Sequence, residues 1–297
     1  MTPQPDYWKS TNENITQESL AVLNEYLLSL KLSNKSQATI EKYKWVLEQF
    51  FTSCSTPIEQ LTSDEVLSWM NQFTKEKKPR TVDLIHSTLS SFFQFCLAED
   101  YMDQRVMKKR WRPKIPQALP KYLSEHEYAR VLLEIETLPI RDRALMLFLF
   151  STGCRSFEVT NLVVSDVDIP KRTAQVTGKG KRIRTVHFSV ECQLALKDYL
   201  ATRTTKDEDP LFLNKFGQPL GKSGIYKITT ELGKRAGISH SLHPHCCRHT
   251  FATMMMARGA NIEFIADELG HSNLNTTRVY ARIPTEDMKM EYQNKMG

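Results

Sequence analysis

The sequence has no apolar stretch long enough to cross a membrane, so we expect no membrane-spanning segment. Its first residues, MTPQPDYWKSTNEN, lack the apolar core of a secretory signal. The six cysteines show no paired framework, and we therefore expect free thiols in a reducing compartment. No internal repeat or low-complexity segment is present either. These absences together indicate a globular cytoplasmic protein without a disulfide scaffold.

The length and composition are those of an ordinary two-domain protein. A chain of 297 residues can form two modest domains, each with a substantial core. Hydrophobic residues make up 40% of the sequence and charged residues 25%, which are common proportions for globular proteins. The formal net charge of +6 is moderate, so the placement of the basic residues says more about a partner than their total does.

Four amphipathic helices are predicted in the first hundred residues. Leucines recur at helical spacing from Gln17 to Leu32, and Ser36 is a suitable N-cap for a second helix. The TSDE sequence at residues 62–65 is a capping box that begins a third helix, and residues 81–98 carry the apolar stripe of a fourth. We therefore predict a polar tail over residues 1–15 and a helical bundle over residues 16–104.

A basic segment without acidic residues follows the bundle. Its cations are Arg105, Lys108, Lys109, Arg110, Arg112, Lys114 and Lys121. Three prolines within it disfavour a regular helix, and we predict a linker over residues 105–120. Such a segment is either an extended, solvated tether or a strap along a phosphate backbone, where each cation contributes through counterion release.

The remaining residues, 121–297, are predicted to form an α+β domain. The SEHE sequence at residues 124–127 is another capping box, and the run 144–150 is apolar on all sides, as in a buried helix. Residues 173–177 and 184–188 are rich in β formers, and the GKGKR sequence between them predicts a hairpin turn. Further helices are expected over residues 189–203, 225–236 and 285–295. The predicted fold class is therefore mainly α, with a small antiparallel β-hairpin or sheet in the second domain.

The stretch over residues 243–280 carries the densest group of chemically active side chains. His245 and Arg248 lie in an H-x-x-R pattern on a predicted helix, and His271 and Tyr280 follow. Arginine is a permanently charged fork suited to phosphate oxygens, histidine moves protons near neutral pH, and an activated tyrosine hydroxyl forms covalent intermediates. Singly, each pattern also fits a solvated helix face or a packed tyrosine. Together these groups suit attack on a phosphodiester.

At these positions the chain resembles the tyrosine recombinases, the lambda-integrase-like family of site-specific DNA recombinases. The matching sequences are HCCRHTFAT from residue 245, LGH at residues 269–271, the tyrosine at 280 and TGCRSFEV from residue 152. The resemblance implies the catalytic set Arg155, Lys179, His245, Arg248, His271 and Tyr280. Glu158 matches the family's acidic position and is expected to orient Arg155 and the histidines. Lys181 remains an alternative to Lys179 on the G-K-G hairpin.

The resemblance also implies a mechanism without ATP, metal or any other cofactor. Tyr280 attacks a backbone phosphate and forms a 3′-phosphotyrosine, while Arg155 and Arg248 stabilise the non-bridging oxygens. Lys179 protonates the leaving 5′-oxygen. His245 is expected to handle the tyrosine proton, and His271 to hydrogen-bond the phosphate or its surroundings.

The implied partner is double-stranded DNA with an inverted-repeat core site. The family acts on two DNA sites as a tetramer, here a homo-tetramer or a hetero-tetramer with a related recombinase. The helical bundle is then a core-binding domain and residues 121–297 are catalytic. We favour a strap for the linker, because a two-domain clamp needs a connection that touches the duplex. The expected DNA-binding residues are Arg105, Lys108, Lys109, Arg110, Arg112 and Lys114, with Lys181 and Arg182 on the hairpin.

The two-domain layout is similar to Xer-type recombinases and to phage and transposon integrases, and we expect a nucleoid-associated cytoplasmic protein of bacterial type. The length leaves no room for the extra N-terminal arm-binding domain of some integrases. Within the enzyme class, a DNA nicking and rejoining topoisomerase is the alternative, since it uses a similar set of residues.

A zinc-stabilised DNA-binding protein without catalysis is the non-enzymatic alternative. Its candidate ligands are His243, His245, Cys246, Cys247 and His249. The spacing of His245 and His249 puts both on one helix face. However, adjacent cysteines on a helix point about 100° apart, and no second C-x-x-C pair completes a structural site. We therefore favour the metal-free site.

Overall fold

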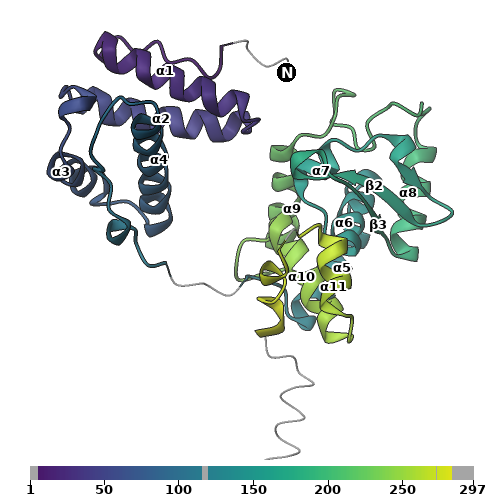
Figure 1. The fold of residues 1–297 in the computed structure, drawn as a ribbon. Helices are drawn as coiled ribbons and strands as arrows, with labels where there is room; N and C mark the ends of the chain where they lie inside the picture. The colour runs from purple at the N-terminus through teal and green to yellow at the C-terminus, as the bar shows by residue number, and fades with distance from the viewer. Residues whose placement is uncertain (1–5, 116–119, 272, 283–297) are drawn as a thin grey trace, which may run out of the picture. The chain divides into compact units, whose positions relative to one another are not determined.

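The computed structural model describes residues 6–115, 120–271 and 273–282 (Figure 1). The chain divides into two compact parts, residues 1–117 and 118–297, here called unit 1 and unit 2. Among the described residues, no helix combines the length and the apolar character needed to cross a membrane. The charged helix predicted over residues 285–295 lies outside the described residues.

Unit 1 is a helical bundle whose helices begin where the sequence supplies a cap. Its helices are α1 (Gln17–Leu32), α2 (Gln37–Ser53), α3 (Ser63–Thr74) and α4 (Pro79–Ala98), with short 3-10 turns at Ile58–Gln60 and Lys109–Trp111. The side chains of Thr16, Ser36 and Thr62 accept backbone N–H groups at the starts of α1, α2 and α3. Aromatic rings from α2, α3 and α4 meet edge to face in the core, at Phe50, Trp69 and Phe93.

The prediction of a polar tail over residues 1–15 is corrected by the structure for its second half. Tyr7 and Trp8 pack against the core of unit 1, and Ile15 is buried. The backbone N–H of Ser10 donates to Asn24 Oδ1 over 2.7 Å, and the Ser10 hydroxyl donates to Glu48. The polar composition misled the prediction, because these polar groups find partners on α1 and α2 while the apolar ones are buried.

The first half of the predicted linker also packs against unit 1. Val106 is buried and Trp111 is partly buried against the same core. His86 on α4 is 3.3 Å from the carbonyl oxygen of Lys108. The Arg112 guanidinium pairs with Asp83 over 2.7 Å. Residues 106–112 are therefore part of the folded unit and are not an extended tether.

Unit 2 combines helices with one small sheet, as the predicted fold class requires; that prediction is confirmed. Strands β1 (Val167–Asp168), β2 (Thr173–Thr177) and β3 (Ile183–His187) form an antiparallel sheet in the order β1-β2-β3, with Ala174 opposite Val186. The helices are α5 (Glu125–Glu136), α6 (Ile140–Thr152), α7 (Ser156–Thr160), α8 (Val190–Ala201), α9 (Lys222–Arg235), α10 (Pro244–Ala257) and α11 (Ile262–Leu269). Short 3-10 turns lie at Val164–Asp166, Lys179–Lys181, Leu274–Thr276 and Tyr280–Arg282.

Helix α6 is the centre of unit 2 because its sequence is apolar on every side. It packs against α8 and α10 (Figure 1), and its side chains from Ala144 to Phe150 are all buried. Strand β1 was not predicted, since two residues are too few to show an alternating pattern. Helix α9 begins at Lys222, three residues before its predicted start.

Gly153 joins α6 to the next helix in a conformation that few other residues adopt. Its φ is 60°, and it ends α6 as a left-handed cap. A Cβ at this position would lie 2.7 Å from Phe251 Cδ1 and 2.8 Å from Leu269 Cδ2. Gly217 shares the left-handed conformation, with a φ of 73°, but a Cβ there would meet nothing within 4 Å. Comparing substitutions at the two glycines therefore separates the free-energy cost of the left-handed backbone from the cost of the close contact with Phe251 and Leu269.

We predict that Gly153→Ala lowers the unfolding free energy of unit 2 much more than Gly217→Ala does. Both variants carry a left-handed alanine, which costs about 1–2 kcal/mol. Only Gly153→Ala also overpacks the α10–α11 contact, which adds about 1–3 kcal/mol. Urea unfolding followed by far-UV circular dichroism measures the difference.

Tryptophan fluorescence supplies the internal control for this prediction. The four tryptophans, Trp8, Trp45, Trp69 and Trp111, all lie in unit 1, so the fluorescence midpoint should stay at its wild-type value in both variants. Equal losses of stability in the two variants would contradict the close contact at Gly153.

Candidate active site

Arg155 and Glu158 are held together by the tight turn between α6 and α7. Arg155 is the residue before α7, and Glu158 lies in the first turn of that helix. The Arg155 backbone N–H donates to Glu158 Oε2 over 2.7 Å, and Arg155 Nη1 donates to Oε1 over 3.1 Å. Glu158 is only 1% exposed, so its charge depends on these donors.

Arg184 on β3 is a member of this group that the sequence analysis missed. Its Nη1 and Nη2 donate to the two oxygens of Glu158 over 2.8 and 3.0 Å, and its Nε donates to the Glu268 carbonyl oxygen over 2.8 Å. Burial by itself would raise the pKa of Glu158, but the hydrogen bonds from Arg184 and from the Arg155 backbone lower it overall. One signal was available: Arg184 shares the inward side of β3 with Val186, where an arginine requires a buried partner.

The expectation that Glu158 also orients the histidines is not what the contacts show. Its hydrogen-bond partners among the described residues are Arg155 and Arg184. It is the Glu268 carboxylate, at the end of α11, that contacts a histidine: its Oε1 lies 2.6 Å from His187 Nδ1. Two carboxylates therefore hold β3 to the neighbouring helices.

Arg248 is fastened to backbone carbonyl groups. It is 3% exposed on α10, and its guanidinium donates to the Gly153 oxygen over 2.8 Å and to the Leu269 oxygen. Arg155 Nη1 also reaches the Leu269 oxygen, at 3.5 Å. The two guanidinium groups thus converge on one carbonyl. Burial, together with the nearby Arg155, lowers the pKa of Arg248 to about 10, so it remains charged at neutral pH.

Tyr280, the predicted nucleophile, contacts His249. Tyr280 is 3% exposed, and it packs in a cluster with Phe251, Ile265 and Leu269. Its hydroxyl lies 2.7 Å from His249 Nδ1 on α10. Burial raises the pKa of the Tyr280 hydroxyl, although the charges of Arg248 and Arg155 act in the opposite direction.

His271 and His245 lie in different surroundings. His271 follows the left-handed cap Gly270, and its Nδ1 is 2.8 Å from the Thr277 hydroxyl. Burial, with Arg248 and Arg155 nearby, lowers the pKa of His271 to about 3, so the ring is neutral. His245 is exposed to solvent over part of its surface, and desolvation of the rest, together with the same two arginines, lowers its pKa.

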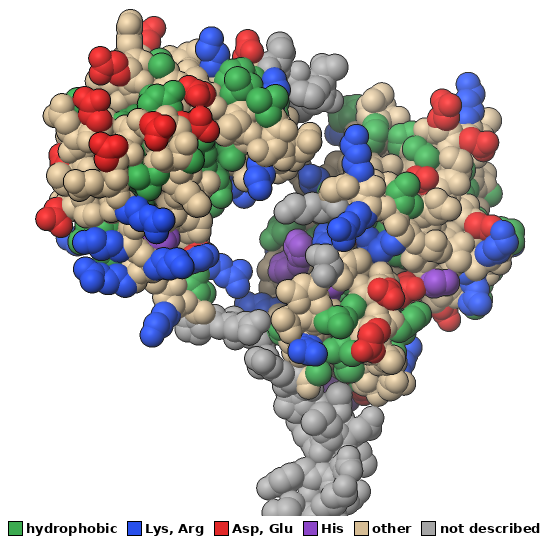
Figure 2. Space-filling model, viewed as in Figure 1, with side chains coloured by type: hydrophobic (Ala, Val, Ile, Leu, Met, Phe, Trp, Pro, Cys, Tyr) green, Lys and Arg blue, Asp and Glu red, His purple; other side chains and the backbone are tan. Residues whose placement is uncertain are grey.

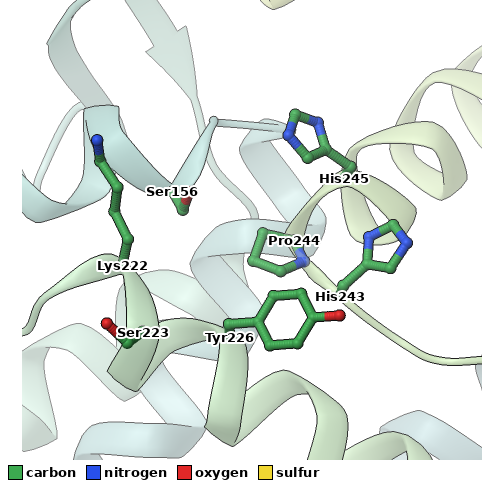
Figure 3. A pocket seen from close by; sticks show the side chains of 7 residues that line it. All are labelled: Ser156, Lys222, Ser223, Tyr226, His243, Pro244 and His245. Atoms are coloured by element: carbon green, nitrogen blue, oxygen red, sulfur yellow. The ribbon is translucent and has the colours of Figure 1, made fainter. Parts of the chain in front are cut away.

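His245 borders a surface pocket that the sequence analysis did not anticipate. The pocket lies where α7, α9 and α10 meet, and Figure 3 shows its lining: Ser156, Lys222, Ser223, Tyr226, His243, Pro244 and His245. The rings of Tyr226 and His243 stack there with 6.2 Å between their centroids. The pocket therefore offers one cation, hydroxyl groups and imidazoles beside a predicted catalytic histidine.

The hairpin predicted to carry Lys179 lies against the Glu158–Arg184 pair. A Cβ at Gly178 would be 3.5 Å from Glu158 Oε1 and 3.6 Å from Arg184 Nη1. Lys179 begins the 3-10 turn that joins β2 to β3. Lys181, which ends this turn, and Arg182, which follows it, are both exposed. The choice between Lys179 and Lys181 stays a prediction.

The side chains proposed as zinc ligands separate. Cys247 is fully buried in the core of unit 2, and Cys246 is buried with its sulfur 3.6 Å from His240. His243 Nδ1 accepts the backbone N–H of Cys246, while His249 contacts Tyr280. Within the described ranges, no three His, Cys, Asp or Glu side chains are grouped to hold a metal ion.

Comparison with known proteins gives the family of the chain. Residues 121–286 match the phage integrase family, and residues 22–103 match the N-terminal SAM-like domain of phage integrases. The chain belongs to the phage integrase family. It is a tyrosine recombinase, an enzyme of site-specific recombination, as the sequence motifs predicted.

Two relatives show how far the similarity extends. The recombinase is 33% identical to the tyrosine recombinase XerA of Pyrococcus furiosus, over 90% of this chain and 91% of the relative. It is 31% identical to the tyrosine recombinase XerC of Bacillus subtilis, over 91% of this chain and 93% of the relative. The similarity therefore covers both units.

Solved structures share the fold. A crystal structure of XerA recombinase aligns with a TM-score of 0.54 at 28% identity, covering 94% of this chain and 99% of that one. The XerH site-specific recombinase bound to a palindromic difH substrate aligns with a TM-score of 0.73 at 20% identity, covering 98% of this chain and 93% of that one.

We predict that Arg184→Gln destabilises unit 2 of the recombinase strongly, because it leaves the buried Glu158 charge with Arg155 alone. The expected loss is about 3–5 kcal/mol in urea unfolding at pH 7. The double variant Glu158→Gln with Arg184→Gln should recover part of this loss, since it buries no unpaired charge. A double variant that is less stable than Arg184→Gln would contradict the pairing.

The stability of unit 2 should also depend on pH through Glu158, and the exposed Arg112–Asp83 pair of unit 1 serves as a control. The pKa of Glu158 is lowered in the folded chain, so its stabilisation is present above pH 4.5 and is lost as the pH falls below that value. The double variant should lack this part of the acid dependence. Arg112→Gln breaks the exposed pair with Asp83 in unit 1, and it should leave the fluorescence midpoint unchanged.

Proposed function

We propose that this recombinase cleaves and rejoins double-stranded DNA at a specific core site through a 3′-phosphotyrosine intermediate. The observation that carries the proposal is an imbalance of charge beside Tyr280. Of the three guanidinium groups gathered here, those of Arg155 and Arg184 pair with the Glu158 carboxylate, whereas that of Arg248 is held by backbone carbonyl oxygens. A phosphodiester supplies the missing negative charge, and the guanidinium fork matches its oxygens.

The reaction begins when Tyr280 Oη attacks the phosphorus atom. The Oη–P bond forms, the bond from phosphorus to the 5′-oxygen breaks, and a 5′-hydroxyl leaves. Arg155 and Arg248 meet the growing charge on the non-bridging oxygens. The Arg155 side chain is held in advance by Glu158, and that of Arg248 by backbone carbonyl oxygens. The 5′-hydroxyl of a partner strand reverses the step. Because the phosphodiester energy is kept in the tyrosyl bond, no ATP is consumed.

Lys179 supplies the proton that the leaving 5′-oxygen needs. Support comes from the hairpin, whose base at Gly178 lies against the Glu158–Arg184 pair. Lys181 and Arg182 add positive charge to the same turn, which favours loss of a proton from a neighbouring ammonium group. No metal ion has a role in this scheme, because the guanidinium groups and the ammonium group supply the cations.

The DNA is bound by cations of both units. On the face of unit 1 seen in Figure 2, Lys and Arg side chains gather along one side, away from most Asp and Glu side chains. Arg105, Lys108, Lys109, Arg110 and Lys114 are exposed, and each is free to meet a phosphate. Arg112 is a weaker candidate than predicted, since it already pairs with Asp83.

The active assembly is a tetramer on two DNA sites, made of four copies of this chain or shared with a related recombinase. The relatives in complex with DNA support a duplex partner: XerH was solved on its difH substrate, and lambda integrase was solved as a dimer on a core site. We assign the same class of partner to this chain on the basis of its charge and family.

We predict that Tyr280→Phe abolishes covalent DNA adducts without preventing DNA binding, because it removes only the hydroxyl. Purified protein is incubated with fragmented genomic DNA from its host and denatured, and the covalent adducts are captured and sequenced. Wild type should yield one recurrent core sequence attached through a 3′-phosphate. Adducts formed by Tyr280→Phe on that sequence would exclude Tyr280 as the nucleophile.

We predict that a 5′-bridging sulfur atom rescues Lys179→Ala. A thiolate leaves with little protonation. The variant should therefore cleave unmodified DNA about 10²–10⁴-fold more slowly than wild type does, and the sulfur-containing substrate at nearly the wild-type rate. Arg155→Ala is the matched control, and it should gain much less from sulfur because it acts on the non-bridging oxygens. Rescue of Lys181→Ala in place of Lys179→Ala would move the role along the hairpin.

A further inference from the structure

His249 occupies the position nearest to the reacting oxygen of Tyr280. Its Nδ1 is 2.7 Å from the Tyr280 hydroxyl, across 31 residues of sequence. The contact joins α10 to the 3-10 turn that carries Tyr280. The two atoms are within hydrogen-bond distance, and in the tautomer that carries the ring proton on Nε2, Nδ1 accepts the single proton of the phenol.

His249 can act as an acceptor because its surroundings keep it neutral. Burial lowers the pKa of His249 to about 4, and the charges of His245, Arg248 and His243 act in the same direction. His271 faces it from the segment after α11, and Tyr280 faces it from the 3-10 turn. A phosphate bound by the arginines would offset their charge, and the imidazolium formed by proton transfer would then be less disfavoured.

His245, the residue expected from the sequence to handle this proton, has a different position. It lies one helical turn before His249 on α10, but its exposed ring borders the pocket of Figure 3. Its ring neighbour in that pocket is His243, with 6.4 Å between the ring centroids. The geometry therefore separates the two histidines into one at the nucleophile and one at the surface.

We propose that His249 accepts the proton of Tyr280 during DNA cleavage, a step that rests on the function proposed above. As the Oη–P bond forms, the Oη–H bond breaks and its proton moves to His249 Nδ1. The bond from phosphorus to the 5′-oxygen breaks at the same time, and that oxygen takes a proton from Lys179. When the 5′-hydroxyl of a partner strand attacks, its proton passes to the Lys179 amine, and His249 returns its own proton to the leaving tyrosine oxygen.

Two substitutions at residue 249 separate proton transfer from positioning. His249→Asn keeps a hydrogen-bonding atom near the place of Nδ1 but cannot take a proton, whereas His249→Ala removes both functions. His245→Ala is the matched control from the same helix. The substrate is the core sequence recovered with wild type, as a duplex nicked a few nucleotides beyond the cleaved phosphate so that the released strand diffuses away. Single-turnover adduct formation is followed from pH 6.5 to 9.5.

Both His249 variants should be about 10²–10⁴-fold slower than wild type at pH 7. Their rates should then rise about tenfold per pH unit, because hydroxide replaces the missing acceptor and burial keeps the Tyr280 hydroxyl protonated over this range. His245→Ala should not show this recovery. Circular dichroism of each variant tests whether it is folded. If His249→Ala does not fold, the His249→Asn variant alone tests the role of His249 as proton acceptor.

Several results would overturn the proposal. A His249→Asn variant with the wild-type rate would reduce His249 to a positioning residue. A His249→Ala variant faster than wild type would mean that the contact restrains Tyr280, and losses without recovery at high pH would indicate a structural role. If His245→Ala alone recovered its rate at high pH, His245 would be the proton acceptor. Failure of the proposed function is distinct: wild type would then form no adduct, or Tyr280→Phe would form one.

Discussion

The buried carboxylate of Glu158 is the contact on which the charged site of unit 2 depends. It receives the backbone and side chain of Arg155 from its own turn and both terminal nitrogens of Arg184 from β3. Burying this charge costs free energy that charged donors on each oxygen offset. Arg184 also bonds the Glu268 carbonyl oxygen, so one carboxylate connects α7, β3 and the end of α11. The arginines are thereby oriented before any phosphate arrives.

Packing links the arginine turn to the tyrosine. Phe251 and Leu269, which lie against Gly153 at the start of that turn, also form the cluster around Tyr280. Gly270 also packs closely against the Arg184 side chain, because a Cβ at this position would lie 3.0 Å from it. Since a closely packed core transmits small displacements, a shift of the tyrosine is felt at the arginines. This is a physical reason for the proposed nucleophile and the arginines proposed to bind the phosphate to move as one group.

The same surplus of positive charge has two effects. In the proposed function it attracts a phosphodiester, and it adds to burial in holding the pKa of His249 at about 4 and that of His271 at about 3. The histidines are thus neutral and able to accept protons at physiological pH. A phosphate that neutralises the arginines changes the proton affinity of the histidines as well. In the proposed reaction, substrate binding and proton transfer are therefore coupled through electrostatics.

The sequence by itself determined the features that are encoded locally. Capping residues marked the starts of three helices, at Ser36, Thr62 and Ser124, and contiguous motifs indicated the family and its predicted catalytic residues. Only the tertiary structure decided which partners meet. Arg184 reaches Glu158 across 26 residues, and His249 reaches Tyr280 across 31. No short pattern specifies such pairs, because they arise when the packing of α10, α11 and β3 brings distant side chains together and leaves each buried charge to find its partner there.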